Sequence, residues 1–160
     1  MPDLIMLVGV PGCGKSFWIE HMPDIFKNKY TVISMDYFIE ELGKPEGLNY
    51  SDSFDKYAGV AARKMKEQLK EALKNRENII WDQTNLTIKS RRKKLNVVPD
   101  DYTKIAMVFE IDGPELEQRR ALRESATGKT VPAFVLQRMQ ASYARPTKSE
   151  GFDSIKIITS

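Results

Sequence analysis

Residues 9–16, near the start of the chain, have the types and spacing of a phosphate-binding loop, because they match G-x-x-x-x-G-K-[ST] at every fixed position. Its three glycines allow positive φ and let backbone N–H groups approach phosphate oxygens. Lys15 supplies a cation for the β- and γ-phosphates, and the Ser16 hydroxyl can bind Mg²⁺. We therefore predict that the chain binds ATP and Mg²⁺. The expected nucleotide contacts are Gly9, Pro11, Gly12, Cys13, Gly14, Lys15, Ser16 and Phe17.

The segments on both sides of this loop favour the same interpretation. Residues 4–8 form an apolar run typical of a buried strand, and residues 17–22 suit the start of a helix. Strand, glycine loop and helix thus follow one another in the order that a phosphate-binding loop requires. A chance match to the pattern is the alternative, and the flanking elements count against it.

Five short apolar runs predict the elements that position the loop. They lie at residues 4–8, 30–33, 78–81, 104–109 and 155–158, separated by longer segments with helical periodicity. Strands joined by helical crossovers form a parallel sheet covered by helices on both faces. We predict one α/β domain over residues 1–160. The clearest helix spans residues 51–75, and Ser51 or Ser53 is expected to cap it.

Two carboxylates follow predicted strands. Asp36 comes shortly after the run at residues 30–33, and Asp82 comes directly after the run at residues 78–81. Ligands of parallel sheets bind beyond the carboxyl ends of the strands, so both acids are expected beside the phosphate loop. We assign Asp82 as a Mg²⁺ ligand, direct or through water, and Asp36 as the general base for an acceptor hydroxyl. Helix capping is the alternative for Asp36.

Basic residues form two later groups. Arg119 and Arg123 are four residues apart and share a helical face, from which Arg123 could stabilise charge on a transferring phosphoryl group. Ion pairs with neighbouring glutamates are the alternative. Residues 123–131 contain small and polar residues, and we predict a flexible lid there. The cluster at residues 89–94 predicts either contact with a polyanion or a solvated helix face.

The composition excludes several kinds of site. The single cysteine, Cys13, rules out an intramolecular disulfide, and a single histidine rules out a Cys/His metal site. Cys13 is expected to be a small loop residue, with an activated thiolate as the alternative. No apolar run approaches the ~20 residues of a membrane span, so we expect no membrane partner and a cytoplasmic location. The net charge of +3 permits a polyanionic partner without requiring one.

In combination, these features resemble the 5′-hydroxyl polynucleotide kinase family, which includes a bacteriophage enzyme and the kinase domain of the animal kinase-phosphatase. The resemblance covers nearly the whole chain. Besides the phosphate loop, Asp36 and the lid arginines, it includes residues 82–86 with Arg91 and Arg92 downstream, and residues 131–139 and 145–152. It implies a P-loop kinase fold with ATP and Mg²⁺ as cofactors and nucleic-acid 5′-hydroxyl ends as substrate.

The resemblance also implies residue roles. Lys15 and Ser16 would bind ATP and Mg²⁺, Asp36 would act as base, Arg119 and Arg123 would contact the donor phosphates, and Thr84, Asn85 and Arg92 would lie beside the acceptor. The bacteriophage enzyme has basic residues where this chain has Met35 and Ile39, so a preference for a 3′-phosphate is not implied.

We therefore expect an ATP-dependent kinase of 5′-hydroxyl ends of DNA or RNA. A kinase of a nucleoside or other small molecule is one alternative. A non-catalytic ATP-dependent nucleic-acid-binding module is another, because a related module of nuclear RNA-binding proteins contains a stretch like residues 82–85. Strand preference and oligomeric state stay open.

Overall fold

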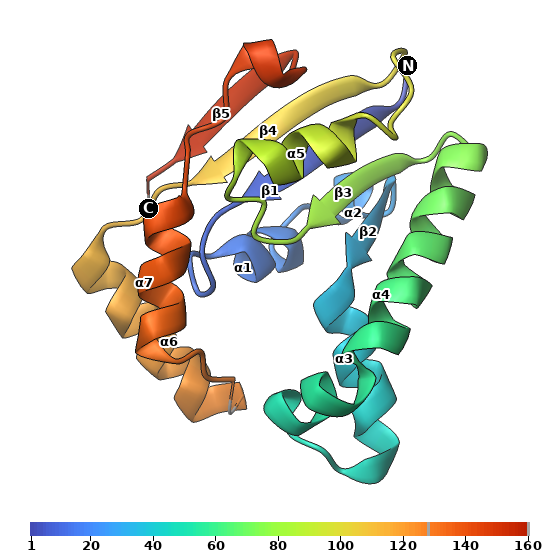
Figure 1. Cartoon of the computed structure of the whole chain (residues 1–160). Coiled ribbons are helices and arrows are strands. Elements are labelled where there is room, and N and C mark those ends of the chain that lie inside the picture. Colours follow the sequence, from blue (N-terminus) through green and yellow to red (C-terminus); the bar gives the residue numbers. More distant parts are fainter. Residues whose placement is uncertain (128, 160) are drawn as a thin grey trace.

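Five strands form one parallel sheet in the computed structural model, which describes residues 1–127 and 129–159 (Figure 1). Their bounds are β1 Asp3–Val8, β2 Tyr30–Ser34, β3 Asn78–Asp82, β4 Thr103–Phe109 and β5 Ser154–Ile158, and their spatial order is β2-β3-β1-β4-β5. All five predicted strands are confirmed. Each is one residue longer than its apolar run, because the strand includes one polar neighbour.

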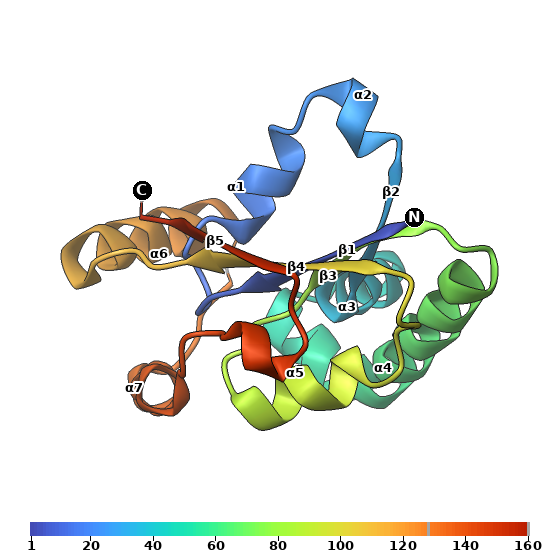
Figure 2. The same ribbon diagram turned by 90° about the horizontal axis from the view of Figure 1, so that it is seen from above.

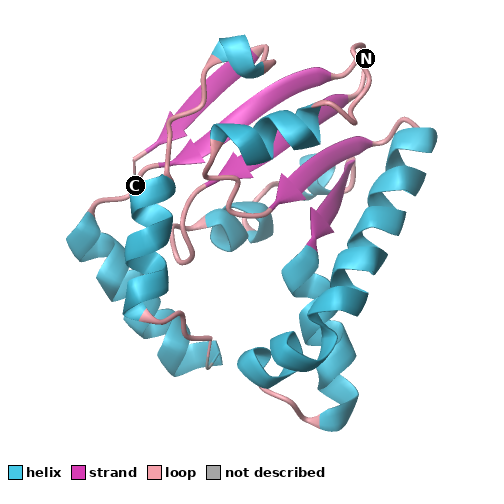
Figure 3. Ribbon diagram, viewed as in Figure 1, coloured by secondary structure: helices cyan, strands magenta, loops and turns pink. Residues whose placement is uncertain are grey.

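Helices alternate with the strands along most of the chain (Figure 3). The α-helices are α1 Lys15–Glu20, α2 Asp24–Lys27, α3 Met35–Gly43, α4 Tyr50–Lys74, α5 Ile88–Leu95, α6 Gly113–Thr127 and α7 Ala133–Ser142. Two 3-10 helices are η1 Lys44–Glu46 and η2 Lys148–Glu150. Figure 2 shows α1 and α2 on one side of the sheet and α3, α4, α5 and α7 on the other. The predicted α/β fold with helices on both faces is confirmed.

Both faces of the sheet are buried, which is why its strands read as continuous apolar runs. Side chains of β1 alternate between the faces: Leu4 and Met6 join the core cluster that contains Leu69 of α4, whereas Ile5 and Leu7 join the cluster on the α1 and α6 side. The central strand is thus held from both sides, and the loop that follows it starts from a rigid support.

The helix predicted at residues 51–75 is confirmed as α4, but its cap is different. Asn49 is the N-cap, and its side-chain oxygen accepts a hydrogen bond from the Asp52 backbone N–H at 2.8 Å. The prediction of a Ser51 or Ser53 cap is wrong, because Ser53 is buried and its hydroxyl donates to the Ile39 carbonyl at 2.5 Å. This contact ties α4 to α3, and the two helices form one wall.

The segment predicted as a flexible lid begins inside a helix. α6 continues to Thr127, so the first part of the predicted lid is helical, as residues such as Arg123 and Glu124 favour. Residue 128 lies outside the described residues, and Lys129 follows it. Movement of this segment stays a prediction. Among the described residues, no helix has the length and apolar character needed to cross a membrane.

Candidate active site

The loop between β1 and α1 has the backbone that phosphate binding requires. Gly12 and Gly14 have positive φ, 85° and 105°. Gly9 does not, which corrects the expectation for this position. A Cβ at Gly9 would collide with the Cys13 sulfur, so the reason for glycine there is close packing. Successive backbone N–H groups in such a turn form a concave anion-binding site.

Cys13 serves this packing rather than chemistry. Its side chain is buried in the core cluster beside α1 and α6. Burial raises the pKa of the Cys13 thiol, and the charge of Lys15 opposes this only in part. The alternative of an activated thiolate is therefore wrong, and Cys13 is a small buried loop residue.

Lys15 and Asp82 face the same space from two elements. The Lys15 ammonium donates to the carbonyls of Gly9 at 2.5 Å and Val10 at 3.3 Å, which holds it over the loop. Asp82 ends β3, and burial raises the pKa of its carboxyl above the ordinary value, with Lys15 acting in the opposite direction. A buried carboxylate of this kind gains from a nearby cation.

Ser16 and Asp82 are the side chains here that fit Mg²⁺. Both are hard oxygen donors, and both line the cleft that contains Lys15. Within the described ranges, no group of three or more His, Cys, Asp or Glu could hold a metal ion. The donor set therefore suits a cation that is bound largely by phosphate and water oxygens, as Mg²⁺ is in phosphoryl-transfer sites.

Asp36 lies in the first turn of α3 and points into this cleft. The capping alternative is wrong, because the Ser34 side chain caps α3 by accepting from the Tyr37 backbone N–H at 3.3 Å. Asp36 instead accepts a hydrogen bond from the Tyr50 hydroxyl at 2.5 Å. Burial and this hydrogen bond both raise the pKa of Tyr50, so Tyr50 stays a protonated donor.

The predicted arginines come from the opposite wall. Arg119 donates to the Cys13 carbonyl at 3.0 Å and to Glu115 at 2.8 Å, so its ion pair with a glutamate and its contact with the phosphate loop coexist. Arg123 lies one turn later and lines the cleft. Its positive charge acts to lower the pKa of Asp82, against the dominant effect of burial, which places it within electrostatic reach of that carboxylate.

Arg120 is a residue that sequence reasoning missed. Its side chain packs over the phosphate loop so closely that a Cβ at Gly12 would lie 2.8 Å from the Arg120 Cγ. One of its guanidinium nitrogens is buried without a hydrogen-bond partner. Its position next to Arg119 in the sequence carried no signal that it covers the loop.

Thr84 and Asn85, which follow β3, have different surroundings. Thr84 lines the cleft, and its carbonyl accepts from the Gly9 backbone N–H at 2.9 Å. Asn85 is only 2% exposed, and its amide donates to the Leu7 carbonyl at 2.7 Å while Lys94 donates to its side-chain oxygen. The expected acceptor contact of Asn85 is therefore replaced by a structural one.

The two neighbouring arginines of α5 also have separate roles. Arg91 is fully buried, donates to the Asn85 and Leu86 carbonyls at 2.9 Å each, and pairs with Glu150 at 2.7 Å. It therefore fixes the segment that presents Thr84. Arg92 is exposed on α5 and does not line the cleft, so the structure does not bring it to the other site residues.

Lys129 joins the two walls. It forms an ion pair with Glu40 of α3, and its ammonium lies 5.1 Å from the centre of the Tyr50 ring. Neither Lys129 nor Tyr50 was a predicted site residue, because their partners lie far away in sequence. Positions 35 and 39 do not serve the acceptor: Ile39 is fully buried, and Met35 packs against the core.

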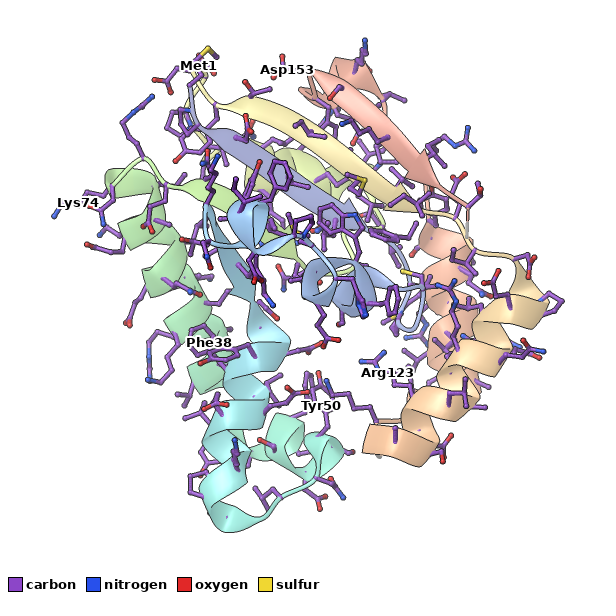
Figure 4. The ribbon with its side chains drawn as sticks, turned by 180° about the vertical axis from the view of Figure 1, so that it is seen from behind. Met1, Phe38, Tyr50, Lys74, Arg123 and Asp153 are labelled. Carbon is purple, nitrogen blue, oxygen red and sulfur yellow. The ribbon has the colours of Figure 1, made fainter. Side chains whose placement is uncertain are left out.

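These side chains surround one cleft of about 1160 Å³ between the α3–α4 wall and α6. Figure 4 shows Tyr50 and Arg123 facing the same space from opposite sides. A second, apolar cavity of about 530 Å³ adjoins the first and is lined by Trp18 and Phe109. Gly14, Phe17 and Arg119 line both cavities, and Phe17 is 64% exposed.

Comparisons with known proteins agree with this architecture. A family model described as an AAA domain, AAA_33, matches residues 4–146. The heterogeneous nuclear ribonucleoprotein U-like protein 2 of Mus musculus is 24% identical over 158 residues, which is 96% of this chain. The chain spans only 21% of that relative's length.

Solved structures share the fold. A chain of the PezAT chromosomal toxin-antitoxin system of Streptococcus pneumoniae has a TM-score of 0.73 at 19% identity, over 99% of this chain and 67% of its own. A chain of the Pnkp1/Rnl/Hen1 RNA repair complex has a TM-score of 0.64 at 23% identity, over 88% and 43%. A gluconokinase from Sinorhizobium meliloti 1021 has a TM-score of 0.55 at 21% identity, over 99% and 82%. The shared fold is that of P-loop kinases.

Proposed function

Because the chain belongs to this AAA domain family and has a P-loop kinase fold, we propose that it transfers the γ-phosphoryl group of ATP to a 5′-hydroxyl end of a nucleic acid. One observation carries the proposal: the phosphate-loop residue Lys15 and the carboxylate of Asp36, from separate elements, line the same cleft. A cation for the donor and a base for the acceptor therefore meet in one space.

The residues that line the cleft have separate roles in phosphoryl transfer. The phosphate loop and Lys15 hold the β- and γ-phosphates, and Arg119 and Arg123 approach from the other wall to stabilise the charge that develops in transfer. Mg²⁺, held by Ser16 and Asp82, would neutralise phosphate charge when bound. Catalysis by such a site comes from positioning and electrostatics, with little covalent chemistry by the protein.

Asp36 takes the proton of the acceptor hydroxyl as the new P–O bond forms and the bond from the γ-phosphorus to the ADP oxygen breaks. A general base of this kind contributes about 10²- to 10⁴-fold to the rate. The apolar cavity beside Gly14 and Phe17 suits the nucleoside part of ATP, because it continues from the phosphate loop and is lined by aromatic side chains.

A nucleic-acid acceptor is supported by the outward face of α5. Lys89, Arg92 and Lys93 are exposed, and the last two lie three and four residues after Lys89, which puts each of them on the same side of the helix as Lys89. None of the three is in an ion pair in the described part of the chain. Residues 83–99 contain no acid that could neutralise them. Such a surface suits phosphate contacts. The name of the ribonucleoprotein relative and the RNA repair complex support the same class of acceptor.

A small-molecule kinase is the second candidate, and one feature of the cleft favours it. The wall around Asp36 carries Glu40 and Glu41, and position 39 is buried, so this wall suits a neutral hydroxyl compound better than a phosphorylated one.

The test measures transfer of the labelled γ-phosphate of ATP, in the presence of Mg²⁺, to a panel of acceptors. The panel contains 5′-hydroxyl DNA and RNA oligonucleotides, 3′-nucleotides, nucleosides and sugars. We expect oligonucleotide labelling that Asp36→Asn reduces at least a hundredfold and that Asp24→Asn, an acid of α2 outside the cleft, leaves unchanged. Labelling of small compounds alone supports the second candidate. Full activity of Asp36→Asn contradicts the assignment of the base, and ATP binding without transfer supports a binding module.

A further inference from the structure

Tyr50 is the point at which the base, the lid segment and the cleft arginine meet. Its hydroxyl donates to Asp36, and the ammonium of Lys129 lies over its ring. The positive charge of Arg123 acts on the pKa of Tyr50, so this arginine is also within electrostatic reach. Figure 4 shows Tyr50 at the start of α4, where it faces the cleft between the two walls.

The contacts of Tyr50 exceed what packing of α3 on α4 requires. The hydrogen bond from Ser53 to the Ile39 carbonyl already joins these helices in a buried position, and Asn49 already caps α4. The Tyr50 hydroxyl instead binds one oxygen of an exposed carboxylate at 2.5 Å. This contact restricts the rotation of Asp36 without adding to the core.

Lys129 makes the second half of the arrangement. It follows α6, which carries Arg119 and Arg123, yet its ion pair with Glu40 and its contact with the Tyr50 ring are both on the opposite wall. Lys129 is thereby held against the acceptor side of the cleft. A cation over an aromatic face contributes most where water is excluded.

We propose that Tyr50 is a positioning residue that orients Asp36 through its hydroxyl and, through its ring, holds Lys129 against the acceptor side of the cleft. This rests on the proposed function, since it assumes that Asp36 is the base. The hydroxyl aims the free carboxylate oxygen at the acceptor, and the contact between Lys129 and the ring excludes water from the γ-phosphate during transfer.

Tyr50→Phe and Tyr50→Leu separate the two roles. Phe removes only the hydrogen bond to Asp36, so we expect kcat for transfer to fall about tenfold with the KM for ATP unchanged. Leu also removes the aromatic ring that Lys129 contacts, so we expect a larger fall in kcat for transfer. We also expect ATP hydrolysis in the absence of an acceptor to rise at least threefold. Tyr37→Phe is the matched control, because Tyr37 is exposed on α3 and its hydroxyl makes no hydrogen bond among the described residues.

Lys129 supplies the decisive comparison. Lys129→Met should raise acceptor-free hydrolysis at least as much as Tyr50→Leu, because it removes the ion pair with Glu40 as well as the contact with the ring, and Lys129→Arg should restore coupling because it keeps a cation at both. Added to Tyr50→Phe, Lys129→Met should have its full effect. Added to Tyr50→Leu, it should have a smaller effect, because only the ion pair with Glu40 is left to lose. Urea unfolding checks that each variant is folded under the assay conditions.

The outcomes separate failure of this proposal from failure of the proposed function. If Asp36→Asn abolishes transfer but Tyr50→Phe and Tyr50→Leu behave as Tyr37→Phe does, the function stands and the role of Tyr50 is refuted. If Tyr50→Leu leaves acceptor-free hydrolysis unchanged, or Lys129→Met has the same effect with Tyr50→Leu as without it, the closing contact alone is refuted. If the parent chain transfers phosphate to no acceptor, or Asp36→Asn is fully active, the assumption about Asp36 fails and the proposal with it.

Discussion

Arg91→Met is expected to destabilise the fold by about 3–5 kcal/mol, because it leaves a charge buried without its partner. Arg91 pairs with Glu150 at 2.7 Å, and the exposed fractions of the two side chains are 0% and 1%. Arg91 also donates to the Asn85 and Leu86 carbonyls at 2.9 Å each. Methionine preserves much of the side-chain volume, so the loss comes mainly from the charge and its hydrogen bonds.

The magnitude follows from the groups left behind. The Leu86 carbonyl keeps its hydrogen bond from the Ala144 backbone N–H at 3.0 Å, so the Asn85 carbonyl is the one left without a donor, at a cost of about 1–3 kcal/mol. The Glu150 carboxylate keeps only its bonds from Thr147, at 2.7 Å from the backbone N–H and 3.2 Å from the hydroxyl. With these bonds retained, the cost of removing Arg91 stays within the range for a broken buried ion pair. For a chain of this size, each kcal/mol lowers Tm by about 2–4 °C, so Tm should fall by roughly 6–20 °C.

The assay is urea unfolding at pH 7, followed by tryptophan fluorescence and circular dichroism. Arg92→Met is the matched control: its side chain is exposed on the same helix, and its free energy of unfolding should change by less than about 0.5 kcal/mol. Adding Glu150→Gln to Arg91→Met removes the unpaired charge, so the double variant should be more stable than the two single effects predict when summed.

Acid provides an independent check on the same pair. Burial acts to raise the pKa of Glu150, but the hydrogen bonds from Arg91 and the Thr147 backbone outweigh it and hold the pKa below the ordinary value of 4.5. A carboxyl with a lowered folded-state pKa contributes stability above its unfolded pKa and loses it as the pH falls through the folded one. The stability gap between the parent chain and Arg91→Met should therefore narrow below about pH 4.5.

A cost of less than about 1 kcal/mol for Arg91→Met, or no more than that of Arg92→Met, contradicts the structural role of Arg91. A stability difference between the parent chain and Arg91→Met that does not change with acid contradicts it as well. Should the fold survive at the assay temperature, kcat should still fall, because Arg91 holds the segment that presents Thr84 to the cleft.

Three further outcomes are expected. Arg123→Ala should lower kcat by roughly 10³-fold with little change in ATP affinity, measured by steady-state kinetics and nucleotide titration; an equal loss of affinity contradicts the assignment. Burial lowers the pKa of Lys94 from 10.5 to about 8. Between these two pH values unfolding therefore takes up a proton, so the stability of the parent chain should rise with pH. The urea midpoint of the parent should accordingly rise with pH more than that of Lys94→Met. Replacing Lys89, Arg92 and Lys93 together by Ala should raise the oligonucleotide KM and flatten its salt dependence, leaving the nucleoside KM unchanged, unlike replacement of three α4 lysines.

Patterns within a few residues were read correctly from the sequence. The five strands are short continuous apolar runs because both faces of the sheet are buried. The phosphate loop is recognised from eight consecutive residues that lead into a helix. Asp36 and Asp82 could also be assigned to the cleft, because the carboxyl ends of parallel strands meet at one edge. The chemistry of the candidate site was therefore predictable wherever it depends on strand ends.

Local errors had local causes. Gly9, Gly12 and Gly14 look equivalent in the motif, but only the last two have positive φ; the first is needed because Cys13 packs against it. The cap of α4 lies at Asn49, just before the predicted start, because Ser53 turns inward toward α3. A sequence pattern describes which residues can play such parts, and packing selects among them.

The tertiary structure alone decided which polar residues act and which support. The five basic residues of α5 look alike in the sequence. Arg91 is nevertheless buried against Glu150, 59 positions later, whereas Arg92 is exposed. The same holds for Arg119, which reaches the Cys13 carbonyl across 106 positions, and for Tyr50, which binds Asp36. Neighbours along a helix constrain only i to i+4 geometry; the partner of a buried charge is set by which elements pack together. The sequence by itself therefore determined the nucleotide loop and the sheet, and the packing of α4, α5 and α6 decided how the cleft is completed.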